Sequence, residues 1–160
     1  MDNDEGALSM LRVLIAEDEL LIADEIEEAL VASGYEVCGI ARTVDEAVAL
    51  GDLHDHDLAV LDVRLVGGDR GTEIDRRLNK REKIGVLYAT AYSSLNRQLT
   101  LNDGEAAIEK PFCSEDLVRA LAIVQEIKAL GGSTSQHPPG FRVLSLWPQS
   151  RAQFAQGSPV

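Results

Sequence analysis

Five short apolar segments, each followed by a segment with helical periodicity, constrain the fold of this chain more than any other feature. The predicted strands cover residues 13–16, 35–41, 58–63, 84–89 and 106–109. The predicted helices cover residues 20–32, 43–50, 72–79, 93–101 and 114–130. Strands that are apolar along their whole length are buried on both faces. The alternation therefore predicts an α/β fold, in which a parallel sheet carries helices on both sides.

Local signals support two of the helix starts. Thr43 stands three residues before Glu46, which is the spacing of a capping box. Ser114 is predicted to cap the last helix, and the acidic Glu115 and Asp116 in its first turn suit the helix dipole.

Polar side chains stand where the predicted strands end. Glu17 and Asp18 follow the first strand, and Asp62 lies near the end of the third. Thr90 follows the fourth strand, and Lys110 with Pro111 follows the fifth. Sites in open parallel sheets form beyond the carboxyl ends of the strands. We therefore expect three carboxylates, a hydroxyl and an ammonium group at one edge of the sheet.

Crowded carboxylates repel one another unless a cation lies between them. Oxygen ligands suit Mg²⁺, with Mn²⁺ as an alternative, whereas a zinc site is not expected because His and Cys do not cluster. A carboxylate beside such an ion can act as a nucleophile and form an aspartyl phosphate. Asp62 is the best-placed nucleophile because it lies in the middle of the predicted sheet edge. Mg²⁺, Lys110 and Thr90 would each stabilise phosphoryl oxygens.

Charge and apolar patterning exclude several classes of partner. The chain has 27 acidic and 15 basic residues, a formal net charge of −12, which argues against binding to nucleic acid or to an anionic membrane. Its apolar runs are too short to span a bilayer. Two cysteines do not make a disulfide framework, and no basic-then-apolar segment suggests secretion, so we expect a cytoplasmic protein.

The set Glu17-Asp18, Asp62, Thr90 and Lys110-Pro111 resembles the receiver domain of two-component response regulators, over about residues 10–130. The resemblance implies a flavodoxin-like (βα)5 fold with strand order 2-1-3-4-5. It implies that a histidine kinase or a histidine phosphotransfer protein phosphorylates Asp62, and that Thr90 and Lys110 sense the phosphoryl group.

The resemblance also implies a metal site and a peptide geometry. Mg²⁺ would be held directly by Asp18 and Asp62, by Glu17 through water, and by the backbone carbonyl of Arg64. The bond before Pro111 would be cis.

Two further features refine the resemblance. The segment Tyr88-Ala89-Thr90-Ala91-Tyr92 is similar to the signature of the "FAT GUY" receiver subgroup, whose members often lack an output domain. Typical receivers carry an aromatic switch residue three positions before the lysine, where this chain has Ala107. Tyr92 is therefore a candidate to replace it.

The predicted organisation is an acidic N-terminal extension (1–10), a receiver domain (11–130), and a flexible linker with a C-terminal tail (131–160). The stretch 141–147 is interpreted either as part of a disordered end, which we favour, or as a segment that docks on the receiver or on a partner.

The predicted function is that of a single-domain response regulator, a monomer or weak homodimer that is not an enzyme. It signals through an unknown downstream protein or passes the phosphoryl group on. The alternatives are a constitutive receiver-like adaptor and an Mg²⁺-dependent phosphatase with an aspartyl nucleophile. Such phosphatases usually need an acid two residues after the nucleophile, where this chain has Arg64.

Overall fold

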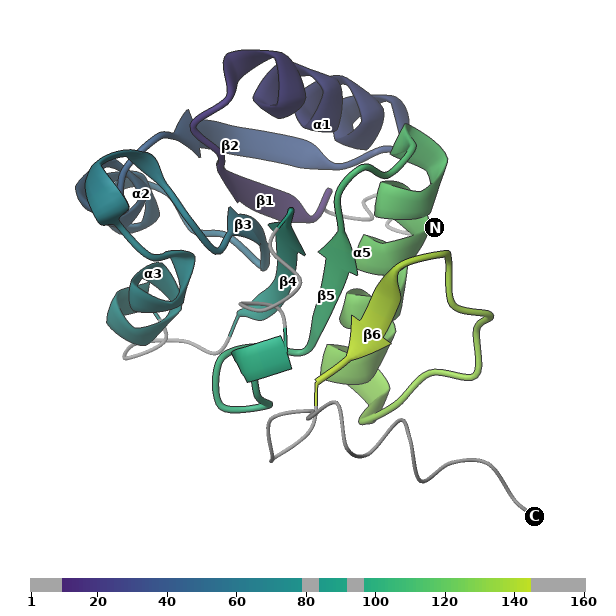
Figure 1. The fold of residues 1–160 in the computed structure, drawn as a ribbon. Helices are drawn as coiled ribbons and strands as arrows, with labels where there is room; N and C mark the ends of the chain where they lie inside the picture. Colours follow the sequence, from purple (N-terminus) through teal and green to yellow (C-terminus); the bar gives the residue numbers. More distant parts are fainter. Residues whose placement is uncertain (1–9, 79–83, 92–96, 145–160) are drawn as a thin grey trace, which may run out of the picture.

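The computed structural model describes residues 10–78, 84–91 and 97–144 (Figure 1). The strands are β1 (Arg12–Ala16), β2 (Glu36–Ala41), β3 (Leu58–Asp62), β4 (Gly85–Thr90), β5 (Ala106–Glu109) and β6 (Phe141–Val143). The α-helices are α1 (Leu20–Ala32), α2 (Val44–Leu53), α3 (Gly71–Leu78) and α5 (Ser114–Leu130), and Val66–Gly68 forms a 3₁₀ turn. The predicted helix at 93–101 lies partly outside the described residues, and residues 97–98 are helical.

The strands form one sheet in the order β2-β1-β3-β4-β5-β6, and β1 to β5 are parallel. The predicted α/β flavodoxin-like fold with strand order 2-1-3-4-5 is therefore confirmed. α1 packs against α5 and α2 packs against α3, so that each helix pair covers one face of the sheet (Figure 1). β3 lies between β1 and β4, in the middle of the parallel part of the sheet.

Alternate residues of the buried strands supply the two cores. Val13 and Ile15 of β1 belong to the cluster under α1 and α5, whereas Leu14 and Ala16 belong to the cluster under α2 and α3. All four are almost fully buried. Two-sided burial explains why these strands are apolar along their whole length, because successive side chains in a strand point to opposite faces.

The start of α2 follows the predicted capping box in part. The Thr43 hydroxyl accepts a hydrogen bond from the Glu46 N–H at 3.1 Å, as expected. The Glu46 carboxylate reaches one residue further back than in the standard motif and accepts from the Arg42 N–H at 2.7 Å.

The prediction that Ser114 caps the last helix was wrong by one residue. Cys113 occupies that position, and its side chain makes no capping hydrogen bond.

β6 is an addition to the predicted sheet. It pairs antiparallel with β5, in the register Ala106 with Val143, Ala107 with Arg142 and Ile108 with Phe141. Residues 141–143 thus follow the interpretation in which this stretch docks on the rest of the domain, and not the disordered end that we favoured. Residues 145–147 of the same stretch lie outside the described residues. Across the ranges that the structure describes, no helix is both long enough and apolar enough to cross a membrane.

Candidate functional site

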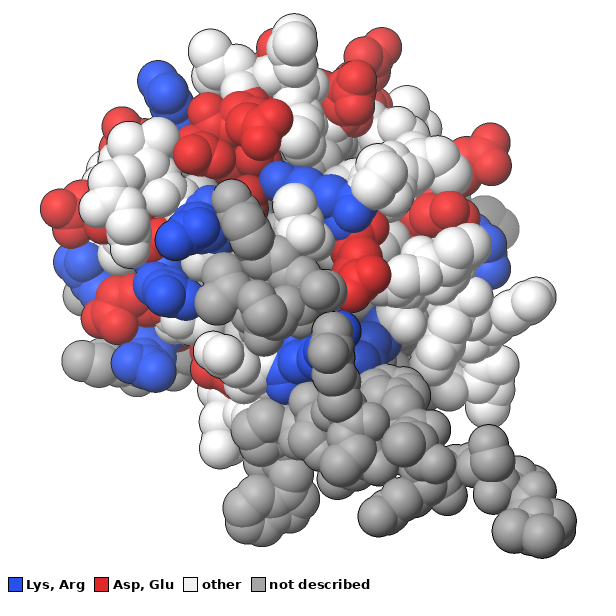
Figure 2. Space-filling view, in the orientation of Figure 1, with Lys and Arg blue, Asp and Glu red and all other residues white. Residues whose placement is uncertain are grey.

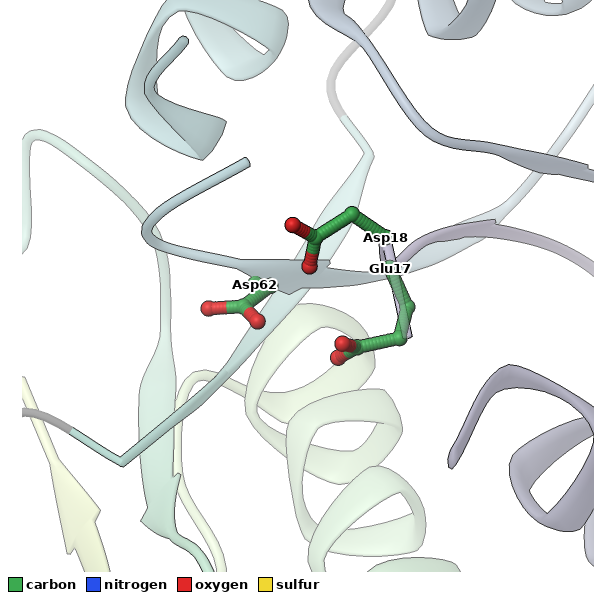
Figure 3. A group of neighbouring side chains, drawn as sticks. All are labelled: Glu17, Asp18 and Asp62. Carbon is green, nitrogen blue, oxygen red and sulfur yellow. The ribbon is translucent and has the colours of Figure 1, made fainter. Parts of the chain in front are cut away.

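Three carboxylates meet at the carboxyl end of the central strands. Glu17 and Asp18 follow β1 and Asp62 is the last residue of β3, so the parallel pairing of the two strands brings them together. One oxygen from each carboxylate lies within 4.8 Å of the other two (Figure 3). Glu17 is 1% exposed and Asp62 is 6% exposed, so two of the three acids are buried. The prediction that the three carboxylates lie together at one edge of the sheet is confirmed.

Lys110 joins two of the carboxylates. Its Nζ lies 2.8 Å from Glu17 Oε2 and 2.8 Å from Asp62 Oδ2. The Lys110 side chain is 11% exposed, and the peptide bond to Pro111 is cis. Although burial alone would lower the pKa of Lys110, its hydrogen bonds and charge attraction to Asp62 and Glu17 raise that pKa above the usual value.

Burial governs the protonation of Glu17. It raises the pKa of this carboxyl from 4.5 to about 7, with the negative charge of Asp62 adding to the rise. The hydrogen bond from Lys110 opposes the rise. The Glu19 N–H also donates to Glu17 Oε1 at 3.2 Å. A buried acid with a raised pKa is a group that a second cation would help to ionise.

Thr90 ends β4 beside Asp62. Asp62 pairs with Ala89 in the register of β3 and β4, so Thr90 lies one residue beyond this pair. Thr90 is fully buried, and its carbonyl oxygen accepts a hydrogen bond from the Lys110 N–H at 3.0 Å. The ends of β3, β4 and β5 are thus held close together.

The loop after β3 is ordered around Asp62. The Arg64 N–H donates to Asp62 Oδ1 at 3.1 Å, while the Gly71 N–H donates to the Val63 carbonyl at 3.0 Å. Asp69 Oδ2 accepts from the Val44 N–H at 3.0 Å and so ties this loop to the start of α2. Sequence reasoning missed Asp69, because the N–H that it accepts from lies 25 residues away.

A pocket of about 350 Å³ opens over these groups. Its lining includes Asp18, Asp62, Arg64, Ala91 and Lys110. On the face drawn in Figure 2, acidic side chains gather directly beside basic ones above this end of the sheet. The pocket therefore offers oxygen ligands and cationic groups to the same small ligand.

A family model supplies the decisive comparison. The model described as the response regulator receiver domain matches residues 13–122, a range that contains Glu17, Asp18, Asp62, Thr90 and Lys110. The chain belongs to the response regulator receiver family. Members are phosphoryl acceptors that are typically not enzymes, and the family implies a histidine kinase as partner.

Curated relatives of this receiver are regulators. It is 34% identical over 138 residues to the transcriptional regulatory protein PdtaR of Mycobacterium tuberculosis, covering 82% of the chain and 67% of PdtaR. It is 37% identical over 103 residues to the phyllosphere-induced regulator PhyR of Methylorubrum extorquens, covering 62% of the chain but 38% of PhyR.

Solved receivers share the fold. The CheY-like receiver domain protein of Methanospirillum hungatei superposes with a TM-score of 0.65 at 29% identity, covering 76% of this chain and 98% of that one. The response regulator TrrA of Thermotoga maritima, solved in complex with Mg²⁺-BeF, gives a TM-score of 0.64 at 27% identity, covering 72% and 99%.

The receiver's acidic cluster fits a magnesium ion. All the candidate ligand atoms are oxygens, and the buried Glu17 carboxyl is destabilised as an anion by its surroundings. Mg²⁺ prefers one or two carboxylates together with water and phosphate oxygens. Asp18, which is only half-buried, leaves access for such ligands. The role of the Arg64 carbonyl as a ligand stays a prediction.

Ala107 stands at the position where the resemblance predicted an aromatic switch residue. Ala107 is fully buried in β5, where it pairs with Tyr88 on one side and Arg142 on the other. The Tyr88 ring is fully buried as well, and its hydroxyl donates to the Asp103 carbonyl at 2.8 Å. Tyr92, the predicted substitute for the aromatic residue, lies outside the described residues.

Proposed function

We propose that this receiver accepts a phosphoryl group on Asp62 from a phosphohistidine of a histidine kinase or a histidine phosphotransfer protein. A carboxylate oxygen of Asp62 would attack phosphorus, the P–N bond to the imidazole would break, and an acyl phosphate would form. The observation that carries the proposal is the position of Asp62. It ends the central strand at the floor of the pocket, with one oxygen on the Arg64 N–H and the other on Lys110.

The remaining groups would stabilise the transferred charge. Lys110 is already within hydrogen-bonding reach of Asp62, and Thr90 lies one residue beyond the Asp62 pair in the neighbouring strand. We assign them to separate phosphoryl oxygens. Bound Mg²⁺, or Mn²⁺, would neutralise the oxygens of the phosphoryl group. We assign Asp18 and Asp62 as direct ligands, Glu17 as a ligand through water, and the Arg64 carbonyl as a further ligand.

For the output, we propose that the phosphorylated receiver binds a downstream protein or passes the phosphoryl group on, in the cytoplasm, without contacting nucleic acid or membranes. Two features support this proposal. The Tyr88–Tyr92 segment resembles that of the FAT GUY subgroup, and the net charge of −12 disfavours contact with phosphate backbones. The chain spans 67% of PdtaR and 38% of PhyR, so the activities of those whole proteins are not transferred.

One observation favours the alternative of a constitutive adaptor. Ala107 replaces the aromatic residue that typical receivers use, which suits an adaptor that binds its partner without phosphorylation. The aspartyl phosphatase alternative is disfavoured, because Arg64 stands where the second acid would be needed.

Binding of beryllofluoride, a phosphoryl mimic, separates the two candidates. We expect Mg²⁺ with beryllofluoride to raise the melting temperature of the wild-type chain. Asp62→Asn should abolish the rise, and Asp24→Asn, which alters an exposed acid of α1, should retain it. An identical response of wild type and Asp62→Asn would contradict phosphorylation at Asp62 and favour the constitutive adaptor.

A further inference from the structure

The contacts of β5 connect the phosphorylation site to β6. Lys110, whose ammonium group bridges Glu17 and Asp62, directly follows β5. The Lys110 N–H donates to the Thr90 carbonyl at 3.0 Å, on the β4 side. One residue earlier, the Glu109 N–H donates to the Gly140 carbonyl at 3.0 Å, on the β6 side. The end of β5 is therefore held between the site and the start of β6.

The chain enters β6 through a backbone geometry that favours glycine. Gly140 has a φ of 73°, and its carbonyl is the one that accepts from Glu109. Beyond the strand, the Leu144 N–H donates to the Glu105 carbonyl at 2.9 Å. Backbone hydrogen bonds thus close both ends of the pairing between β5 and β6.

β6 packs around the position where the usual aromatic residue is missing. Leu144 is 3% exposed and belongs to the same apolar cluster as Ala107, Tyr88 and Leu99. Phe141 packs against the opposite cluster, under α1 and α5. The segment therefore contributes side chains to both faces of the sheet beside Ala107, which itself offers only a methyl group.

The attachment of β6 is short. The strand has three residues, and side-chain hydrogen bonds hold the connection from α5. Ser133 and Ser135 donate to the Glu126 carboxylate, and Arg119 donates to the Gln136 carbonyl. Although Leu144 is buried, a three-residue strand at the edge of the sheet pairs with one neighbour only. Such edge elements open at a lower free energy than the core, so β6 can separate while the parallel sheet stays folded.

A phosphoryl group on Asp62 would change the contacts of Lys110. Its Nζ sits 2.8 Å from both Glu17 and Asp62, which is direct hydrogen-bonding distance. The group would offer the Lys110 ammonium group new anionic oxygens in competition with Glu17 and Asp62. Lys110 would then shift, and with it the peptide group that joins it to Glu109.

Resting on the function proposed above, we infer that β6 takes the place of the missing aromatic switch residue. It pairs with β5 while Lys110 contacts Asp62 directly, and it separates from β5 when Asp62 carries a phosphoryl group. Separation leaves the edge of β5 without its backbone hydrogen-bond partners in β6.

Hydrogen exchange of the full chain, measured by NMR with and without Mg²⁺ and beryllofluoride, tests this inference. The mimic should speed exchange of the Leu144 and Glu109 amides by about fivefold or more. Exchange of the Glu36 amide, which donates to Leu11 at the opposite edge of the sheet, should not change. Asp62→Asn should show no effect at any of the three amides.

Thermodynamic reciprocity gives a second measurement. If the mimic favours the state in which β6 is separated from β5, then a substitution that favours the same state must tighten binding of the mimic. Leu144→Ala removes buried contacts of the segment and should lower the dissociation constant of beryllofluoride. Val143→Ala, at a residue of the same strand that is 40% exposed, is the matched control and should leave it unchanged.

The outcomes separate this inference from the function on which it rests. Asp62-dependent binding of the mimic with unchanged or slower exchange at Leu144 would overturn the role of β6 and leave phosphorylation intact. Weaker binding of the mimic by Leu144→Ala would overturn it as well. Absence of Asp62-dependent binding would overturn both.

Discussion

Gly71 packs closely against the backbone of Asp62, and this contact allows a quantitative prediction. Gly71 is the first residue of α3, and a Cβ atom built on it would lie 2.1 Å from the Asp62 carbonyl oxygen. Contacts below 3.0 Å are essentially never seen for real Cβ atoms. The partner atom is backbone, so rotation of a side chain cannot relieve the contact. Gly71→Ala must therefore push α3 away from Asp62 by about 1 Å.

Three contributions set the size of the effect. Alanine has a higher helix propensity than glycine, which favours the variant by up to about 1 kcal/mol. Overpacking a close contact costs about 1–3 kcal/mol. Moving α3 also stretches the hydrogen bond from the Gly71 N–H to the Val63 carbonyl, a contribution of about 1 kcal/mol. The clash outweighs the propensity, so the variant should lose about 1–3 kcal/mol of unfolding free energy.

Urea denaturation measures this loss, and Gly132→Ala is the control because no atom lies within 4 Å of its Cβ position. The control should stay within about 0.5 kcal/mol of the wild type. Since the strained atom belongs to Asp62, Gly71→Ala should also weaken binding of beryllofluoride. A Gly71→Ala variant as stable as the wild type would refute the reasoning, because propensity would then have outweighed the contact.

Further predictions concern the cap of α2, the ion pair and the metal. Thr43→Ala removes the hydroxyl that caps α2 and should cost about 1 kcal/mol in urea denaturation, whereas Thr134→Ala, at an exposed residue, should cost little. Lys110→Met leaves two buried carboxylates without their ammonium partner and should cost about 3–5 kcal/mol without Mg²⁺, with partial recovery when Mg²⁺ is added. Mg²⁺ at 100 times its dissociation constant should raise the unfolding free energy of the wild type by about 2.7 kcal/mol. Because Asp18→Asn removes one carboxylate of the cluster, this variant should need a higher Mg²⁺ concentration for the same rise in melting temperature.

The parallel sheet and the site were predictable because both follow from local patterns. The segments that form β1, β3 and β4 are buried on both faces, so their apolar composition marks them as central strands. Parallel strands end at one edge, which is why Glu17, Asp62 and Lys110 meet although 93 residues separate the first from the last. The sequence did not reveal that Lys110 would bridge the two acids, because this depends on side-chain geometry at the edge.

β6 escaped prediction for a physical reason. Three residues, Phe141–Val143, are too few to show the alternation that marks a strand, and the preceding stretch contains the glycine and prolines typical of a loop. Its stability depends on the free edge of β5 and on packing of Leu144 with residues far along the chain. The role of Asp69 was not predictable for the same reason, because it depends on the Val44 N–H at the start of α2.

Phosphorylation at Asp62 is the central claim, and the mass of the protein after incubation with acetyl phosphate and Mg²⁺ tests it most directly. We predict that the wild type and Asp24→Asn each gain the mass of one phosphoryl group, that hydroxylamine removes it as expected for an acyl phosphate, and that Asp62→Asn gains none. A phosphoryl group on Asp62→Asn, or none on the wild type, would contradict the account.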